Sequence, residues 1–309
     1  MFGPLALSNF AVEAFIAVTT ALGNALVLWV IIRRQQLHTT TNVFIASLAA
    51  SDMLVGLVGI PCVLVTSFGL PRNLYGCLLV NCAILSFTQV SIFGLLSVAL
   101  ERFVAIRFPF LYTQYVTTTV ALVVSAVNWL IGCFIGLIPL FGWNLGWNDA
   151  DVCNFILVID LRYHVYMGFF VFMLGPLLIM FAIYVYIFSV LRRANRQIAA
   201  VQVSAVVSSE STHASIVRKE IKAAAKFGVV IGAFVIAWVP LEIMNAVTIW
   251  FGSTCIPCIY LGVWLSHLNS AINPFIYAYG NSYMRIALKN TILFWRTPEV
   301  HSENTTSVA

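Results

Sequence analysis

Residues Cys77–Arg107 read CLLVNCAILSFTQVSIFGLLSVALERFVAIR, an almost unbroken apolar run that opens on a cysteine and closes among arginines. At about 1.5 Å per helical residue, a helix from Cys77 to Arg102 would be roughly 38 Å long. Because the hydrocarbon core of a bilayer is only about 30 Å thick, the run predicts a tilted membrane-spanning helix. Its polar residues Asn81, Thr88 and Ser91 share one face, which predicts neighbouring helices on that side.

The composition predicts an integral membrane protein. Of the 309 residues, 61% are hydrophobic and 9% are charged, and the mean hydropathy is +0.97. Soluble domains carry about 25% charged residues, so a soluble chain of this composition would lack the polar surface to cover itself. Residues 1–9 have no positively charged segment of a signal peptide, so we expect the first span itself to direct insertion.

Seven apolar stretches have the length of a membrane span, namely Phe10–Ile32, Asn42–Phe68, Cys77–Arg107, Val120–Phe141, Tyr163–Arg192, Arg218–Trp250 and Pro257–Tyr279. Most lysines and arginines gather on one side of the resulting topology, and only Arg72 and Arg162 fall on the other. The positive-inside rule then places the N-terminus outside the cell and the C-terminus in the cytoplasm. The net charge of +5 faces anionic lipid, and we expect no nucleic acid partner.

The chain is predicted to have four parts. Residues 1–9 form an extracellular N-terminus, 10–280 the seven-span domain, 281–296 an amphipathic helix at the membrane surface, and 297–309 a disordered cytoplasmic tail. The polar segment Gln197–Ser215 is predicted to be a flexible cytoplasmic connector. No internal repeat is apparent in the sequence, which counts against transporters built from duplicated halves.

The cysteines divide by their side of the membrane. Cys77 and Cys153 both fall outside, in an oxidising compartment, where we expect a disulfide to hold the second outer loop over the bundle. Cys255 and Cys258 also face outside and favour a small disulfide ring over a redox or zinc motif. The other three lie within spans and are interpreted as packing residues: Cys62, Cys82 and Cys133.

Ionisable residues inside the spans are more informative, because each costs at least about 2.5–3.5 kcal/mol at the bilayer centre. They are Glu13, Asp52, Glu101, Arg102, Glu242 and His267. A helix-packing hydrogen bond is the simplest explanation of any one of them. Asp52 is different, since polar residues lie at comparable depth on three other helices: Asn24, Ser91, Asn269, Ser270 and Asn273. Oxygen ligands around a carboxylate favour a small hard cation such as sodium, with Asp52, Ser91, Asn269 and Asn273 as the expected ligands.

Short motifs recur in order along the spans: Asn24, Leu48–Asp52, Glu101-Arg102-Phe103, Trp129, Pro176, Tyr184, Trp238-Val239-Pro240 and Asn273–Tyr277. Each is weak alone, but together they are specific, and the chain resembles rhodopsin-like (class A) G-protein-coupled receptors. The departures are mild, because Glu101 replaces the commoner aspartate and Phe103 the commoner tyrosine. The resemblance implies an all-α membrane protein, a seven-transmembrane helix bundle with a short amphipathic eighth helix.

A second set of residues points within that family: Glu13, Thr88-Gln89, Pro139–Asn144, Cys153–Phe155, Trp238–Leu241 with Asn245, and Ser266–Ser270. With these residues the chain looks like adenosine receptors from its first span to its seventh. Receptors for amines are disfavoured, because they need an aspartate where this chain has Ile84. The resemblance implies no cofactor apart from an allosteric sodium ion that opposes agonist binding. It implies as partners a small-molecule purine agonist, a heterotrimeric G protein and the lipid bilayer of the plasma membrane.

The side chains themselves suit a purine ligand. An asparagine amide can donate to and accept from adenine at once, and Asn245 lies about two helical turns from Trp238. Phe155 can stack on a flat heterocycle, while Ser266, His267 and Thr88 can bind ribose hydroxyls. Alternatively, Phe155 fills the loop and Thr88 bonds its own helix. The expected ligand-binding residues are Phe155, Asn245, Thr88, Ile84, Trp238, Glu242, Ser266, His267 and Glu13.

The resemblance also implies how a signal leaves the receptor. Agonist binding should move the sixth helix outward and free Arg102 for the C-terminal helix of a G protein. In the resting state Glu220 can pair with Arg102 as a lock worth roughly 1–3 kcal/mol. The expected coupling residues are Glu101, Arg102, Glu220, Tyr184 and Tyr277. Inhibition of adenylyl cyclase is the output that the resemblance suggests.

Other classes of function stay open. An enzyme has little support, since the intramembrane residues include neither a Ser/His/Asp set nor a catalytic metal set. An ion-coupled transporter or channel could use Asp52, Glu242 and His267 as an ion path, although the receptor motifs argue against it. A receptor of the same fold for a different small ligand is the other alternative.

Three residues depart from the adenosine-receptor pattern at the ligand pocket. Glu242 stands where members of that family have histidine or a small polar residue, Ile156 where several have an acid, and Gly168 where they have a polar side chain. A bare carboxylate would be costly, so we expect Glu242 to be protonated, paired with His267, or waiting for a donor from the ligand. Alternatively, Glu242 turns away to packing or water.

Overall fold

The computed structural model describes residues 4–147, 152–203, 210–280 and 282–293, with side chains at 7–147, 152–193, 196, 228–229, 232–278 and 283–293. Within these ranges the regular structure is helical, apart from one isolated antiparallel bridge between Asn144 and Ile159. The predicted all-α fold class is confirmed. All seven predicted spans are helical.

The spans consist of nine longer elements and two irregular turns. In chain order they are α1 (Pro4–Arg33), α2 (Thr40–Leu54) with the π-helical η2 (Val55–Gly59) and α3 (Ile60–Thr66), α4 (Leu74–Arg107), α6 (Thr118–Leu137) with the 3₁₀ turn η3 (Ile138–Phe141), the π-helical η4 (Tyr163–Leu174) with α8 (Gly175–Val203), α9 (Glu210–Phe251) and α10 (Ile256–Gly280). Short helices lie between or after the spans: η1 (Gln35–Leu37), α5 (Pro109–Tyr115), α7 (Phe155–Val158) and α11 (Ser282–Ile292).

Polar side chains set where several helices begin. Thr39 accepts a hydrogen bond from the backbone N–H of Asn42 at the start of α2, and Asn73 accepts one from Gly76 at the start of α4. Thr117 caps α6 and Asn154 caps α7 in the same way. Because the first turn of a helix has free N–H groups, such caps stabilise it by about 1 kcal/mol each.

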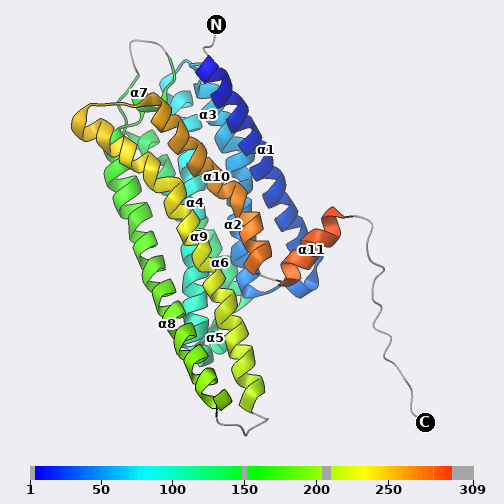
Figure 1. Cartoon of the computed structure of the whole chain (residues 1–309). Coiled ribbons are helices and arrows are strands. Elements are labelled where there is room, and N and C mark those ends of the chain that lie inside the picture. Colours follow the sequence, from blue (N-terminus) through cyan, green and yellow to red (C-terminus); the bar gives the residue numbers. More distant parts are fainter. Residues whose placement is uncertain (1–3, 148–151, 204–209, 281, 294–309) are drawn as a thin grey trace.

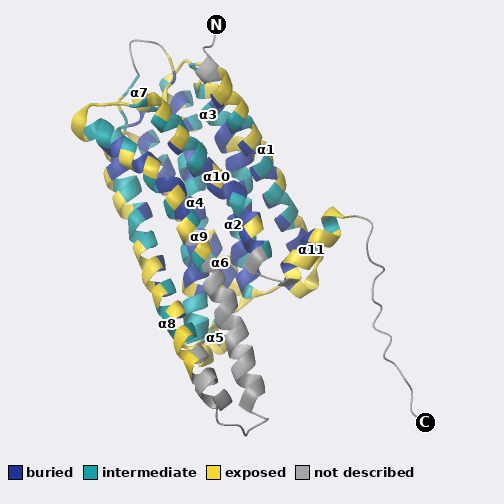
Figure 2. Ribbon diagram, in the orientation of Figure 1, coloured by how far each residue is buried: buried dark blue, intermediate teal, exposed yellow. Residues whose placement is uncertain are grey.

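Helix α4 is the axis of the bundle, in contact with α2, α6, α8 and α9 (Figure 1). Small residues allow close approach on one side: a Cβ added to Gly132 of α6 would lie 2.8 Å from the backbone nitrogen of Val90. Buried residues face the interior of the bundle and exposed residues face outward (Figure 2). Many of the exposed residues are large and apolar, as suits a lipid environment. α7 lies near the beginning of α1, at what we call the disulfide end, and α5 and α11 lie at the opposite end, the Arg102 end.

One prediction about the segments between spans needs correction. The connector Gln197–Ser215 was predicted to be flexible, but the chain is helical to Val203 and again from Glu210, because α8 and α9 extend beyond the apolar core. Residues 204–209 lie outside the described part.

Six described helices are long and apolar enough to cross a membrane. α10 is not among them, because polar residues interrupt it, yet it packs between α1 and α9 as the seventh span.

Candidate functional site

The disulfide end is held together by the link that the sequence predicted. Cys77 of α4 is bonded to Cys153, and the backbone N–H of Cys153 donates to the carbonyl of Gly69 at 3.0 Å. The loop before α7 is therefore anchored both to α4 and to the segment after α3. A second disulfide joins Cys255 to Cys258 at the beginning of α10.

This anchor places Phe155 next to a polar cluster, which we call the outer cluster and define as His164, Glu242 and Asn245. The ring of Phe155 meets the ring of His164 edge to face, with centroids 5.4 Å apart. His164 Nε2 lies 3.3 Å from Glu242 Oε1, and Asn245 Nδ2 lies 3.5 Å from Glu242 Oε2. The cluster joins η4 to α9, and Phe155 also packs against the apolar residues around the Cys77–Cys153 link.

Of the three alternatives expected for Glu242, pairing with His267 is the one that the structure does not show. His267 Nδ1 lies instead 2.8 Å from Glu13 Oε2, which joins α10 to α1, whereas Glu242 faces η4. Glu13 and Glu242 are each 1% exposed or less, so each carboxylate has its own histidine in the interior. His164 is the residue that the sequence pattern did not single out. A second histidine inside a spanning stretch was the available signal.

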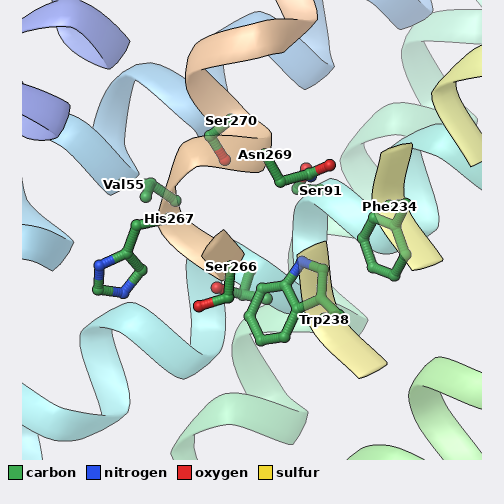
Figure 3. Close-up of a pocket in the computed structure, with 9 residues that line it drawn as sticks. Val55, Ser91, Phe234, Trp238, Ser266, His267, Asn269 and Ser270 are labelled. Carbon is green, nitrogen blue, oxygen red and sulfur yellow. The ribbon is translucent and has the colours of Figure 1, made fainter. Parts of the chain in front are cut away.

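A cavity lies inside the bundle (Figure 3), next to Asp52 through the lining residues Ser91 and Ser270, which donate to its carboxylate. It is lined by residues of the second, third, sixth and seventh spans: Val55, Thr88, Ser91, Phe234, Trp238, Ser266, His267, Asn269 and Ser270. Four of the predicted ligand-binding residues therefore share one space: Thr88, Trp238, Ser266 and His267. Phe155, Glu242 and Asn245 belong to the outer end instead, and Glu13 reaches the cavity only through His267.

Ile84 also lies away from this cavity. It packs into a separate apolar cluster with Ile16, Val55 and Ile60, and a Cβ added to Gly59 would lie 2.6 Å from its Cδ1. It lies behind Val55, which lines the cavity, and its expected role in ligand binding stays a prediction.

The carboxylate of Asp52 accepts three hydrogen bonds. Ser91 of α4 and Ser270 of α10 donate to Oδ1 at 3.0 and 2.8 Å, and Asn273 of α10 donates to Oδ2 at 2.7 Å. The group is fully buried. Hydroxyl and carboxylate oxygens thus converge beside the cavity, and the amide oxygen of Asn273 is buried with no hydrogen bond from a described residue. Such oxygen donors fit a small hard cation.

A third polar cluster occupies the Arg102 end. Glu101 Oε1 accepts hydrogen bonds from Thr41 of α2 at 2.8 Å and from Tyr112 of α5 at 2.6 Å. Arg102 donates to the Thr41 hydroxyl at 2.8 Å, and its Nε lies 3.3 Å from Glu101 Oε2. Burial, together with the hydrogen bond to Glu101, raises the pKa of Tyr112, so its phenol stays protonated and donates.

The structure describes fewer contacts for the other predicted coupling residues. Tyr184 is half-buried on α8 near Gly228 of α9, and Tyr277 of α10 is buried with its hydroxyl making no hydrogen bond to a described residue. The side chain of Glu220 lies outside the described residues, so its pairing with Arg102 stays a prediction. Thr41 and Tyr112 were not predicted, since nothing in their local sequence distinguishes them from other residues that carry a hydroxyl group.

Comparisons with known proteins agree with this architecture. The family described as 7 transmembrane receptor (rhodopsin family) matches residues 23–277. The chain is similar to adenosine receptor A2a of Homo sapiens, with 38% identity over 87% of this chain and 68% of the relative. It is also similar to adenosine receptor A3 of Bos taurus, with 36% identity over 87% of this chain and 84% of the relative. The chain therefore belongs to the rhodopsin-like (class A) family of G-protein-coupled receptors, as a multi-pass membrane protein related to adenosine receptors and not an enzyme.

Proposed function

We propose that this receptor binds adenosine or a related purine nucleoside at its disulfide end and activates a heterotrimeric G protein at its Arg102 end. The disulfide end and the N-terminus face the outside of the cell, as the distribution of lysine and arginine favours, and the protein resides in the plasma membrane. Two relatives carry the name adenosine receptor, which supports a purine as the ligand class.

The observation that carries this proposal is the vertical order of the side chains. Phe155 and Asn245 lie at the outer end, suited to stack on and hydrogen-bond a purine ring. Below them, the cavity offers the hydroxyls of Thr88 and Ser266 and the imidazole of His267. A nucleoside has the matching order, a flat base followed by a ring of hydroxyl groups.

Two residues prepare the lower part of this pocket. Glu13 holds the imidazole of His267 at 2.8 Å and so fixes the ring that faces the ribose. Trp238 forms the apolar floor, stacked on Phe234 with ring centroids 5.9 Å apart. Since both aromatic rings are on α9, a ligand that displaces Trp238 would act directly on the sixth span.

Asp52 would hold the allosteric sodium ion together with Ser91, Asn269 and Asn273. A cation there would hold α2, α4 and α10 together in their resting arrangement. By linkage, sodium and agonist would each weaken the binding of the other by the same factor.

Signalling would pass through Arg102. Glu101 and Arg102 are held by Thr41 and Tyr112 in the present arrangement, and Glu220, Tyr184 and Tyr277 would complete the coupling surface. Release of Arg102 would let it contact a G protein. We propose a G protein that inhibits adenylyl cyclase.

The test is nucleotide exchange on purified G proteins of each class, driven by purified receptor in lipid nanodiscs with adenosine, inosine, guanosine or buffer. At least one nucleoside should stimulate exchange, and Asn245→Ala should abolish the response while Ile243→Ala, a lipid-facing change on the same helix, leaves it intact. A response to no purine would favour a receptor for another small ligand. Nucleoside flux into vesicles without G protein would favour the transporter.

A further inference from the structure

Glu242 is a buried carboxylate with unused hydrogen-bonding capacity. It is 1% exposed, and His164 Nε2 lies 3.3 Å from its Oε1 as an ion-pair partner, while Oε1 makes no hydrogen bond of good geometry with a described residue. An ionised carboxylate has about four acceptor sites. A buried acceptor left in this state is costly unless a partner arrives.

The neighbouring amide turns the same face of the pocket into a set of acceptors. Beside a carboxylate, the Asn245 side chain must present its NH₂ group to Glu242, and Nδ2 lies 3.5 Å from Oε2. Its carbonyl oxygen then points away from Glu242. A ligand that meets Asn245 and Glu242 together encounters one amide oxygen and one carboxylate, which both require donors, beside the second N–H of the amide, which requires an acceptor.

The hydrogen-bonding edge of the purine ring decides which ligand can supply donors to these acceptors. Adenine presents an amino group next to a ring nitrogen that carries a lone pair, and this lone pair is repelled by a carboxylate. A 2-amino-6-oxopurine presents a ring N–H beside an amino group, two adjacent donors that a carboxylate can accept in parallel. A charge-assisted pair of this kind is about twice as strong as neutral hydrogen bonds.

We propose that Glu242 is a specificity-determining residue that selects a purine nucleoside with two adjacent N–H donors, of the guanosine type, over adenosine. This inference rests on the proposed nucleoside site and narrows its ligand. Ile156 and Gly168 bring no hydrogen-bonding side chain of their own, so the described polar groups of this cluster are Glu242, Asn245 and His164.

His164 acts as the positioning residue. Its imidazole contacts Glu242 on one side and the edge of Phe155 on the other. His164 would therefore hold the Glu242 carboxylate in a fixed position relative to a base stacked on Phe155. Because His164 touches Glu242 through a single nitrogen, the carboxylate keeps its other acceptor sites for the ligand.

The experiment is competition binding and ligand-induced thermal stabilisation of purified full-length receptor with guanosine, inosine and adenosine. Wild type should bind guanosine most tightly, inosine next with one donor, and adenosine least. Glu242→Gln should weaken guanosine by about 10- to 100-fold, the value of one charge-assisted hydrogen bond, and leave adenosine equal or tighter. His164→Gln should weaken guanosine less and leave the order of ligands unchanged, while Tyr166→Phe, which removes another contact between the fifth and sixth spans, should change neither.

The outcomes separate the two proposals. Adenosine binding at least as tightly as guanosine in wild type, or an unchanged guanosine-to-adenosine ratio in Glu242→Gln, would overturn this inference and leave the purine receptor standing. Binding of none of the three nucleosides would overturn the proposed function, and the inference with it. Guanosine preference that is lost in Glu242→Gln and kept in Ile243→Ala supports the inference.

Discussion

Two carboxylates at different depths of the same bundle are equally buried and very differently bonded. Asp52 accepts three hydrogen bonds of 2.7–3.0 Å from α4 and α10. Glu242 has a histidine nitrogen at 3.3 Å and an amide at 3.5 Å, and one of its oxygens has no hydrogen bond from a described residue. The first is built into the structure of the resting bundle. The second has the incomplete bonding of a group that waits for a ligand.

Two further buried carboxylates fall between these extremes. Glu101 accepts hydrogen bonds from Thr41 and Tyr112 and lies against Arg102, whereas among the described residues Glu13 is bonded to His267 alone. If bonding rather than burial decides how far each carboxylate stabilises the receptor, then disrupting them should give effects in the order Asp52, Glu101, Glu13, Glu242.

The largest loss is expected for Asp52→Asn. The amide keeps one acceptor oxygen but turns a donor toward either the hydroxyls or the amide of Asn273, so at least one buried donor loses its partner. We expect the free energy of unfolding to fall by about 3 kcal/mol. Chemical or thermal unfolding of the purified receptor in nanodiscs measures it.

The same variant tests the cation. In wild type, raising sodium at constant ionic strength should weaken agonist binding, and in Asp52→Asn the dependence should vanish. Replacement of sodium by N-methylglucamine is the control. Sodium dependence that persists in the variant would remove Asp52 from the proposed cation site.

A smaller loss is expected for Tyr112→Phe, which removes one donor to Glu101 and leaves the Thr41 hydrogen bond in place. The free energy of unfolding should fall by about 1.5 kcal/mol, because the lost hydrogen bond ends on a buried charged group. Tyr115→Phe, an exposed tyrosine on the same short helix, is the matched control and should be neutral. Equal stability of both variants would show that α5 contributes nothing to the resting state of Arg102.

The fold could be predicted almost completely, because a membrane leaves few ways to satisfy the backbone. Apolar runs of spanning length indicated seven helices, and the Cys77–Cys153 link was expected because both cysteines fall on the same predicted side of the membrane. The ends were less predictable. α8 and α9 run into the polar segment 197–215 because helix formation there depends on propensity as well as on burial.

The candidate site also had a part that the sequence could predict and a part that it could not. Asp52 and its oxygen neighbours shared a depth, and depth along a span can be counted in residues. The partner of Glu242 could not be predicted by counting residues along a span, since it depends on which way α9 is rotated against η4 and α10. His164 and His267 lie at opposite sides of the pocket, and only the packed structure distinguishes them.

Glu13→Leu should cost less than either variant above. Leucine fills most of the volume but leaves His267 Nδ1 without its partner, so the free energy of unfolding should fall by about 1 kcal/mol. Thr19→Val removes only a hydrogen bond to the backbone of the same helix and is the control on α1. Nucleoside affinity should fall in Glu13→Leu alone, and unchanged affinity would contradict the role of Glu13 in orienting the imidazole.

The smallest effect is expected for Glu242→Met, and its sign separates the two explanations of the outer cluster. If His164 and Glu242 form a structural pair, removing one partner should cost about 3 kcal/mol or more, as for other buried pairs. If the carboxylate is instead held ready for a ligand, an apolar side chain of similar volume relieves its desolvation. The unliganded receptor should then keep its free energy of unfolding or gain up to about 1 kcal/mol. The side chain of His164 is 12% exposed against 1% for Glu242, so the imidazole is the less enclosed of the two partners. Unfolding of the purified receptor without nucleoside, beside Asp52→Asn in the same lipid, measures the difference. A loss that matches the loss in Asp52→Asn would make the two carboxylates alike and leave Glu242 with no capacity to spare for a ligand.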